Sequence, residues 1–174
     1  MMQKSQIETD DIVLNFLGDR KIKEPKDLVE LRAYIQNYLE FREYDEQGKE
    51  HEKSIRWKRT ASDIIKDGYV YKGKSCSDLS IIFLALCKAA GAEGYLVKLI
   101  SLDKKNTHSI VEVKLDDKWY RLDITVKDSV PFEGQLPPDQ IWNKNWLGGW
   151  KLWKRGRDLW DLGLNDINSD INEE

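Results

Sequence analysis

The chain has 174 residues, of which 40% are hydrophobic and 34% are charged, as expected for one soluble globular domain. Its formal net charge of −3 provides no basic surface field, so nucleic acid is not an expected partner. No apolar run approaches the roughly 20 residues that cross a bilayer, and the polar N-terminus lacks the apolar core of a secretory signal. A cytoplasmic protein without membrane contact is therefore expected.

The N-terminal third of the chain is predicted to be mainly helical. Loosely periodic apolar residues indicate a first helix over residues 7–17. A clearer spacing of three to four indicates a second helix over residues 26–43, with Pro25 at its start. The charged stretch 43–54 is interpreted as a solvated loop. A shorter helix follows over residues 60–66.

Residues 75–90 predict a further helix, because their apolar side chains form one stripe and Gly91 stands where the helix would end. Ser75 and Asp78 have the spacing of a capping box, which would place Cys76 in the first turn. There the unpaired backbone N–H groups and the helix dipole favour an anion such as a thiolate. Cys76 is therefore a candidate nucleophile.

A plainer interpretation of a single cysteine is a small buried hydrophobe, and Cys87, on the apolar stripe of the same helix, fits that description. One helix would hold the two cysteines too far apart for a disulfide. Nothing among the two cysteines and two histidines of the chain has the spacing of a structural zinc site, so no metal or other cofactor is expected. A metal bound by Cys76, His108 and a third ligand is the alternative to a nucleophile.

Three strands are predicted after this helix, over residues 95–100, 107–115 and 118–125. Asp116 and Asp117 stand between the last two and would form a two-residue loop. In the hairpin that results, one face is almost wholly apolar. Because side chains alternate along a strand, a slip of one residue would invert that face, so the pairing is well specified.

The same register places Glu112 opposite Arg121, an opposite-charge pair that supports it. It also puts His108 and Asp123 on the other face, within reach of a hydrogen bond. A carboxylate at the far nitrogen of an imidazole orients the ring and stabilises its charged form, which leaves the other nitrogen for Cys76. The alternative is a surface histidine beside a surface aspartate on a polar face.

The order of these features over residues 60–125 resembles the transglutaminase-like superfamily. A cysteine opens an amphipathic helix, a histidine lies in a later strand, and an aspartate follows within a W-x-x-x-D-x-T segment. The resemblance implies an α+β, papain-like fold in which a helical N-terminal lobe contains the central helix with Cys76, packed on an antiparallel sheet. Lys74, Ile110 and Ile124 depart from the family pattern, which indicates a divergent member.

The resemblance also implies the chemistry. Cys76 would attack an amide carbonyl to form a thioester, with His108 as the base and Asp123 orienting it. Trp57 is a candidate oxyanion donor. The expected function is a cysteine-dependent amide hydrolase (a peptidase, amidase or deamidase) or an acyltransferase, acting on a protein or peptide substrate. Hydrolysis is preferred by analogy, because the chain has no room for the extra domains of large crosslinking enzymes. The alternative is an inactive module with a structural or interaction role.

Beyond residue 130 the sequence changes character, with prolines and then five tryptophans between residues 142 and 160. Their spacing is compatible with one helical stripe, although two glycines interrupt it. Such a stripe indicates core packing first, and a protein-binding surface at 142–160 second. A single domain is expected over residues 1–164, with its tryptophan-rich part at 131–164, before an acidic, frayed tail at 165–174.

Overall fold

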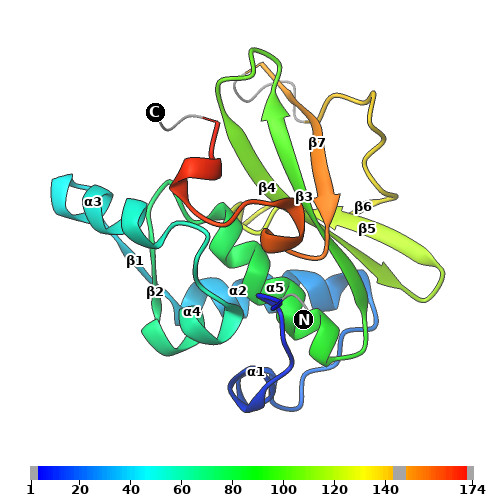
Figure 1. The fold of residues 1–174 in the computed structure, drawn as a ribbon. Helices are drawn as coiled ribbons and strands as arrows, with labels where there is room; N and C mark the ends of the chain where they lie inside the picture. Colours follow the sequence, from blue (N-terminus) through cyan, green and yellow to red (C-terminus); the bar gives the residue numbers. More distant parts are fainter. Residues whose placement is uncertain (1–3, 143–147, 172–174) are drawn as a thin grey trace.

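A computed structural model of the protein describes residues 4–142 and 148–171, in which a helical layer packs against an antiparallel sheet (Figure 1). The helices are α1 (Asp11–Leu17), α2 (Pro25–Tyr38), α3 (Glu46–Ile55), α4 (Ala61–Asp67) and α5 (Cys76–Ala89), with short 3-10 turns η1 (Trp160–Leu162) and η2 (Ile167–Ser169). The strands are β1 (Glu40–Arg42), β2 (Tyr69–Tyr71), β3 (Glu93–Ser101), β4 (Thr107–Leu115), β5 (Lys118–Leu122), β6 (Phe132–Glu133) and β7 (Trp150–Gly156).

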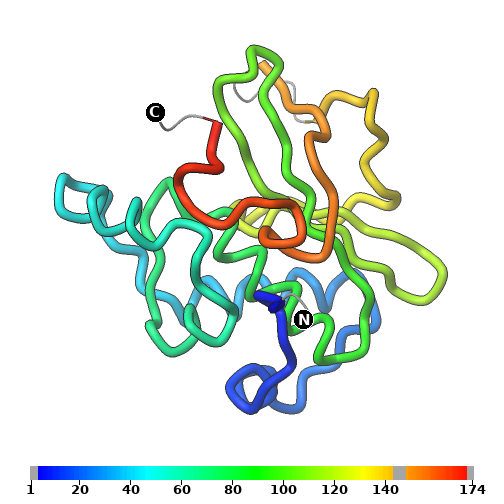
Figure 2. The backbone as a smooth tube through the Cα atoms, viewed as in Figure 1, coloured from blue at the N-terminus to red at the C-terminus, as the bar shows by residue number. Residues whose placement is uncertain are grey.

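Five strands form the main sheet of the described residues in the order β6-β5-β4-β3-β7, all antiparallel to their neighbours. The strand β7 comes from the C-terminal part of the chain and pairs beside β3. Figure 2 shows the chain beyond β7, coloured red, returning across the side of the molecule where the helices lie. The strands β1 and β2 make a separate parallel pair within the helical layer.

The helix α5 is the centre of the fold. It packs on β3 and β4 on one side and on α1, α2 and α4 on the other, and ten of its side chains are buried. A helix that is hydrophobic on all sides is stable only when it is enclosed in this way. Each fully buried leucine, isoleucine or phenylalanine contributes about 1.5–3 kcal/mol to folding. The predicted central helix on an antiparallel sheet is confirmed.

The hairpin of β4 and β5 has the predicted register, with Val111 paired with Leu122 and Glu112 with Arg121. The face that contains Val111 packs against the helices. The opposite face is not the polar face of the surface-histidine alternative, because it carries a second core of buried residues: Val97, Leu99, Ile110, Leu136 and Trp150. In addition, the salt bridge of Glu112 is to Arg155 at 2.7 Å rather than to Arg121. The predicted register was therefore right, although that ion pair does not form.

Two predictions in the N-terminal third were wrong. The second helix ends at Tyr38 rather than at residue 43, because Leu39 turns to an extended conformation and the chain enters β1, which pairs with β2. The stretch 43–54 is not a solvated loop, since α3 occupies most of it. Its N-cap is Asp45, whose carboxylate accepts from the Gly48 backbone N–H at 2.8 Å.

Gly48 indicated a loop in the sequence, yet it lies inside α3 for a steric reason. A Cβ at this position would stand 2.4 Å from the backbone oxygen of Glu43 and 3.1 Å from the Tyr71 ring. The glycine therefore permits a close approach of the helix to its surroundings. The contact with Tyr71 on β2 is a tertiary contact and leaves no periodic signal in the sequence.

The C-terminal part is better ordered than predicted. The tryptophan stripe does not form a helix, because β7 contains two of its members and extends through the segment. Core packing is confirmed for four of its five tryptophans, Trp142, Trp150, Trp153 and Trp160, whereas Trp146 lies outside the described residues. The tail was predicted to be frayed, yet residues 165–171 contain η2 and hold Asp170 in an ion pair with the buried Arg56.

Candidate active site

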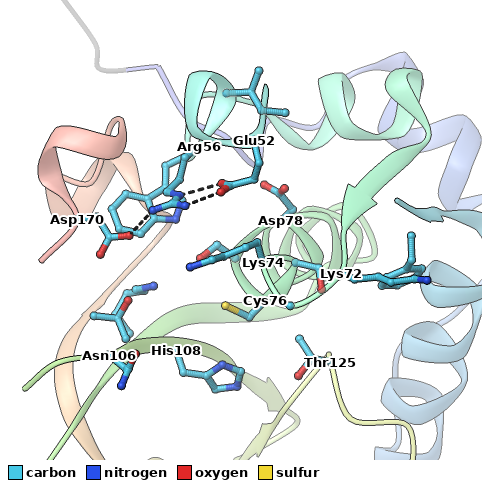
Figure 3. Close-up of a pocket in the computed structure, with 18 of the residues that line it drawn as sticks. Glu52, Arg56, Lys72, Lys74, Cys76, Asp78, Asn106, His108, Thr125 and Asp170 are labelled. Carbon is cyan, nitrogen blue, oxygen red and sulfur yellow. Dashed lines mark hydrogen bonds and ion pairs between the residues drawn. The ribbon is translucent and has the colours of Figure 1, made fainter. Parts of the chain in front are cut away.

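A cavity of about 470 Å³ opens where the N-terminus of α5 meets the ends of β3 and β4. Its lining includes Cys76, His108 and Trp57, together with Lys98, Thr125 and Trp150. Figure 3 shows the Cys76 sulfur inside this cavity, with His108 and Thr125 on the side of the sheet. The volume is in the range of small-molecule and peptide side-chain sites.

Cys76 is the first residue of α5, in the first turn as predicted, and is half-buried. The capping box expected at Ser75 is absent, because the Ser75 side chain makes no cap hydrogen bond and its backbone is already in the helical region. The carboxylate of Asp78 instead accepts from Arg59 at 2.8 Å. Arg59 thus holds the first turn of α5 from outside, and Ser80 donates to the Cys76 carbonyl at 2.7 Å.

His108 and Asp123 lie together behind the cysteine. The Nε2 atom of His108 is 2.7 Å from Oδ2 of Asp123, and the two residues are only 5% and 4% exposed. The alternative of a surface histidine beside a surface aspartate is therefore wrong. The second oxygen of Asp123 accepts from Thr125 twice, from the backbone N–H at 2.8 Å and from the hydroxyl at 2.6 Å.

The pKa values of the cysteine and the histidine move in opposite directions. Burial alone would raise the pKa of Cys76, but the hydrogen bond and charge of His108, the charge of Lys98 and the backbone N–H of Ser109 lower it to about 6. Burial alone would lower the pKa of His108, but its hydrogen bonds to Asp123 and to Cys76 raise it to about 9. The pair is therefore a thiolate and an imidazolium near neutral pH.

The carboxylate of the site is itself held in its charged form. Burial would raise the pKa of Asp123, whereas the hydrogen bond and charge of His108 and the two bonds from Thr125 lower it. Since Nε2 of His108 faces Asp123, the hydrogen bond to Cys76 uses Nδ1. The three residues form a chain of thiol, imidazole and carboxylate, in which each group orients the next.

The loop that follows Asp123 is fastened by α2. Arg32, which is 2% exposed, donates to the backbone oxygens of Asp123 at 3.1 Å and Lys127 at 2.8 Å, and to the hydroxyl of Ser129 at 2.6 Å. Gln36 donates to the Ile124 carbonyl. Sequence reasoning missed these supports. The available signal was an arginine on the apolar stripe of the second predicted helix.

Trp57 lines the cavity and is 6% exposed. Its backbone has a φ of 62°, a conformation that is strained for a bulky residue and needs external support. Its carbonyl accepts from the Gln6 side chain at 3.3 Å and from the Trp160 indole at 2.8 Å. The two ends of the chain therefore fix the residue that was predicted to supply an oxyanion contact.

A polar cluster beside the cysteine was also missed. Ser109 and Ser77 share a hydrogen bond of 2.8 Å, and Lys98 donates to Ser109 at 3.1 Å. The sequence contained a signal for this cluster, because Lys98 and Ser109 are polar residues two positions from Leu96 and Val111, which are apolar and pack against the helices.

The far wall of the cavity is an ion-pair network. Arg56 donates to Glu52 at 2.8 Å and to Asp170 at 3.0 Å, and Figure 3 shows both contacts above Cys76. Arg56, Glu52 and Asp170 are each less than a tenth exposed at their side chains. This network brings the C-terminal segment to the cavity.

Residues 4–142 and 148–171 are the described ranges. In these ranges no three His, Cys, Asp or Glu side chains come together so that they could hold a metal ion. In the same ranges, no helix combines the length and the apolar character needed to cross a membrane.

The sequence was compared with protein families and with curated proteins. Residues 18–124 match the family model of the transglutaminase-like superfamily, which extends the resemblance seen in the sequence toward the N-terminus. Among curated proteins, none matches the sequence significantly.

Solved structures share the fold at low sequence identity. A candidate cysteine protease from Cytophaga hutchinsonii has a TM-score of 0.51 and 17% identity over 91% of this chain and 51% of that one. LapG from Legionella pneumophila has a TM-score of 0.50 and 18% identity over 86% of this chain and 78% of its own. A TGase has a TM-score of 0.50 and 13% identity over 68% and 32%. The chain thus spans about half the length of the Cytophaga structure.

Proposed function

Because the chain belongs to the transglutaminase-like superfamily, we propose that it is a cysteine-dependent amide hydrolase or acyltransferase that acts through a thioester at Cys76. The observation that carries this proposal is the hydrogen-bonded chain from Cys76 through His108 to Asp123, in which the thiol pKa is lowered to about 6. A thiolate is the reactive form of cysteine, so the site has its nucleophile ready at neutral pH.

The reaction begins with attack of the Cys76 thiolate on a carboxamide carbon, which pushes the carbonyl electrons onto oxygen. As the tetrahedral intermediate collapses, the C–N bond breaks and the His108 imidazolium gives its proton to the leaving amine. A thioester and a neutral imidazole remain. The imidazole then takes a proton from water, the resulting hydroxide adds to the thioester carbon, and the C–S bond breaks to restore the thiolate. The products are a carboxylic acid and an amine.

The oxyanion of the intermediate needs hydrogen-bond donors near the sulfur. As the first residue of α5, Cys76 has a backbone N–H without an acceptor in the helix, and the helix dipole adds positive potential there. Trp57, which lines the same cavity, is proposed as the second donor through its indole N–H. Each such donor contributes about 3 kcal/mol to lowering the barrier in comparable sites.

Asp123 holds His108 in the orientation that both steps require. Its charge stabilises the imidazolium, which is the state that delivers a proton to the amine. Because Thr125 occupies the other oxygen, the carboxylate cannot rotate without losing two hydrogen bonds.

A protein or peptide is the proposed substrate. Cys76 lines the cavity and is half-buried rather than enclosed, and one structural relative is a candidate cysteine protease. The same thioester could pass its acyl group to an amine instead of water. Binding of a protein partner by residues 142–160 is a separate proposal. Of this segment, the structure describes residues 142 and 148–160.

The first test is alkylation of Cys76 by iodoacetamide as a function of pH. We expect the rate to rise with a midpoint near pH 6, and the Cys76→Ser variant to lose the modification, whereas the buried Cys87 should remain unmodified in the folded protein. Mass spectrometry of tryptic peptides identifies the alkylated residue.

Activity is then measured on casein and on glutamine-containing peptides, with and without a fluorescent primary amine. Release of new termini indicates a peptidase, conversion of glutamine to glutamate a deamidase, and incorporation of the amine a transferase. A Cys76 that reacts only with the midpoint of a free thiol would contradict the proposal and favour an inactive module on the same fold.

A further inference from the structure

The side chain of Lys98 is buried beside the nucleophile, and no carboxylate of the described residues forms an ion pair with its ammonium. Lys98 is 1% exposed and lies on β3, facing the helical layer. Among the described residues, its ammonium contacts the hydroxyl of Ser109 at 3.1 Å and lies 4.9 Å from the centre of the Trp57 ring. Burying a charged ammonium with only neutral partners is costly, so its position points to a role in the site.

Ser109 connects this ammonium to the sulfur. Its hydroxyl accepts the hydrogen bond from Lys98, while its backbone N–H donates to Cys76. The hydroxyl also shares a hydrogen bond with Ser77 in the first turn of α5. One residue of β4 therefore fixes both the cation and the anion of the cluster.

The strand pairing changes at this position. Along β3 and β7, Lys98 is paired with Lys154 but the next residue, Leu99, is paired with Leu152, so β7 contains one extra residue here. Bulges of this kind re-aim side chains and are frequent at active sites. The irregularity lies directly beside Lys98, which lines the cavity.

The charged groups around Lys98 come from several elements. Cys76 and Asp170 favour its positive charge, and Arg56 and Lys74 oppose it. Figure 3 shows these four residues around the cavity. Asp170 already pairs with Arg56, and the Cys76 sulfur favours the positive charge of Lys98 more strongly than Asp170 does. Burial lowers the pKa of Lys98 and the charge of Cys76 opposes that change, so each group stabilises the charged form of the other.

We propose that Lys98 is a positioning residue of the nucleophile, a buried cation that acts with His108 to hold the Cys76 sulfur as a thiolate. The inference rests on the proposed function of Cys76. It adds a second source of positive charge that remains after His108 has given its proton to the leaving amine. At that stage Lys98 keeps the sulfur a good leaving group, because it stabilises the thiolate that is released when the thioester is hydrolysed.

The test compares Lys98→Met with the unmodified protein in two measurements. Methionine has similar length and no charge, so the pH midpoint of iodoacetamide alkylation should rise by about one unit, which is the scale of the effect of a nearby charge. The melting temperature should increase at the same time, because an apolar side chain replaces a buried charge. Lower thiol reactivity together with higher stability is a result that a merely structural role would not produce.

Lys154→Met is the matched control, since Lys154 stands opposite Lys98 on β7 but donates to the Leu162 carbonyl outside the cavity. It should leave the alkylation midpoint unchanged. Lys98→Gln, which is neutral and polar, gives the same midpoint test if methionine disturbs the fold. His108→Ala combined with Lys98→Met should raise the midpoint further than either change alone.

An unchanged midpoint in both neutral variants of Lys98, with the unmodified protein still near pH 6, would overturn the inference and leave the proposed function standing. A midpoint near the free-thiol value in the unmodified protein would instead overturn the proposed function itself. The two failures are therefore distinguishable in one experiment.

Discussion

The thiol of Cys76 and the imidazole of His108 share one hydrogen bond, and their pKa values lie on either side of neutral, at about 6 and about 9. Below the lower value the sulfur is a protonated, weak nucleophile. Above the upper value His108 has lost the proton that the leaving amine needs. The two groups are correctly charged only between these values.

We therefore expect amide hydrolysis to follow a bell-shaped pH profile with limbs near pH 6 and pH 9. The chain contains two histidines, His51 and His108, so proton NMR can follow their ring resonances separately, with His51→Gln as the assignment control. The resonance of His108 should titrate near pH 9, and Cys76→Ala should lower that value because both the hydrogen bond and the thiolate charge are removed. A titration of His108 at its ordinary value in the unmodified protein would contradict this assignment.

Neutralising the carboxylate should shift both partners. In Asp123→Asn the imidazolium loses its counter-charge, so the pKa of His108 should fall and the alkylation midpoint of Cys76 should rise by roughly one to two units. Thr125→Val removes one hydrogen bond to Asp123 but leaves its charge, and should move the midpoint much less. Equal effects of the two variants would mean that the orientation of the carboxylate, rather than its charge, controls the thiol.

At the scale of elements, the site is assembled from the N-terminus of α5, the hairpin of β4 and β5, and the loop after Asp123. Local rules explain the first two. Alternation along the strands puts His108 on the face that also receives Asp123, and the first turn of a helix offers free N–H groups to the sulfur. The loop depends on α2, because its backbone oxygens find their donors in Arg32 and Gln36.

Arg32→Met should lower the free energy of unfolding by about 2 kcal/mol, because several buried acceptors lose a charged donor. Gln36→Ala should cost about 1 kcal/mol, since one neutral hydrogen bond is lost. Arg32→Lys keeps the charge but not the planar fork, and should be intermediate. Urea denaturation measures all three, and a change below about 0.5 kcal/mol for Arg32→Met would show that α2 does not hold the loop.

At the scale of the whole molecule, the two ends of the chain converge on the cavity. The Gln6 side chain donates to the Trp57 carbonyl and accepts from the backbone N–H of Leu159, and Asp170 reaches Arg56. In Figures 1 and 2 the C-terminal segment lies across the gap between α3 and the sheet. The walls of the site therefore come from sequence positions more than a hundred residues apart.

Glu52→Gln should destabilise the protein more than Asp170→Asn. Glu52 holds Arg56 through two hydrogen bonds from the same helical face and is nearly fully buried, so its neutralisation leaves a buried guanidinium poorly balanced, at a cost of about 3 kcal/mol. Asp170→Asn leaves that pair intact and should cost about 1 kcal/mol.

Thermal unfolding of both single variants and of the double variant measures these costs and the coupling between them. Lys26→Gln, which removes an exposed ion pair with Glu24, is the control and should be nearly neutral. A larger loss for Asp170→Asn than for Glu52→Gln would mean that the C-terminal segment, rather than α3, fixes Arg56.

The sequence by itself determined the features that depend on near neighbours. Apolar periodicity and Gly91 defined the helix that begins at Cys76, and the period of two in the hairpin put His108 and Asp123 on one face, because both patterns arise within a single element or between adjacent strands. Where the structure differs from the sequence-based prediction, the cause is a contact with a residue far away in the sequence. At Gly48 the helix α3 passes close to the Tyr71 ring of β2, and Asp78 is held by Arg59 rather than by a capping box.

Only the tertiary structure decided that the sulfur meets the imidazole, that Lys98 is buried beside both, and that Asp170 closes the far wall. Each of these contacts joins elements that are far apart in the chain, so its geometry depends on how α5 packs against the sheet and on how the C-terminal segment returns. A one-dimensional pattern records which face of an element is apolar. It does not record the distance between two elements, which is set by the packing of the side chains between them.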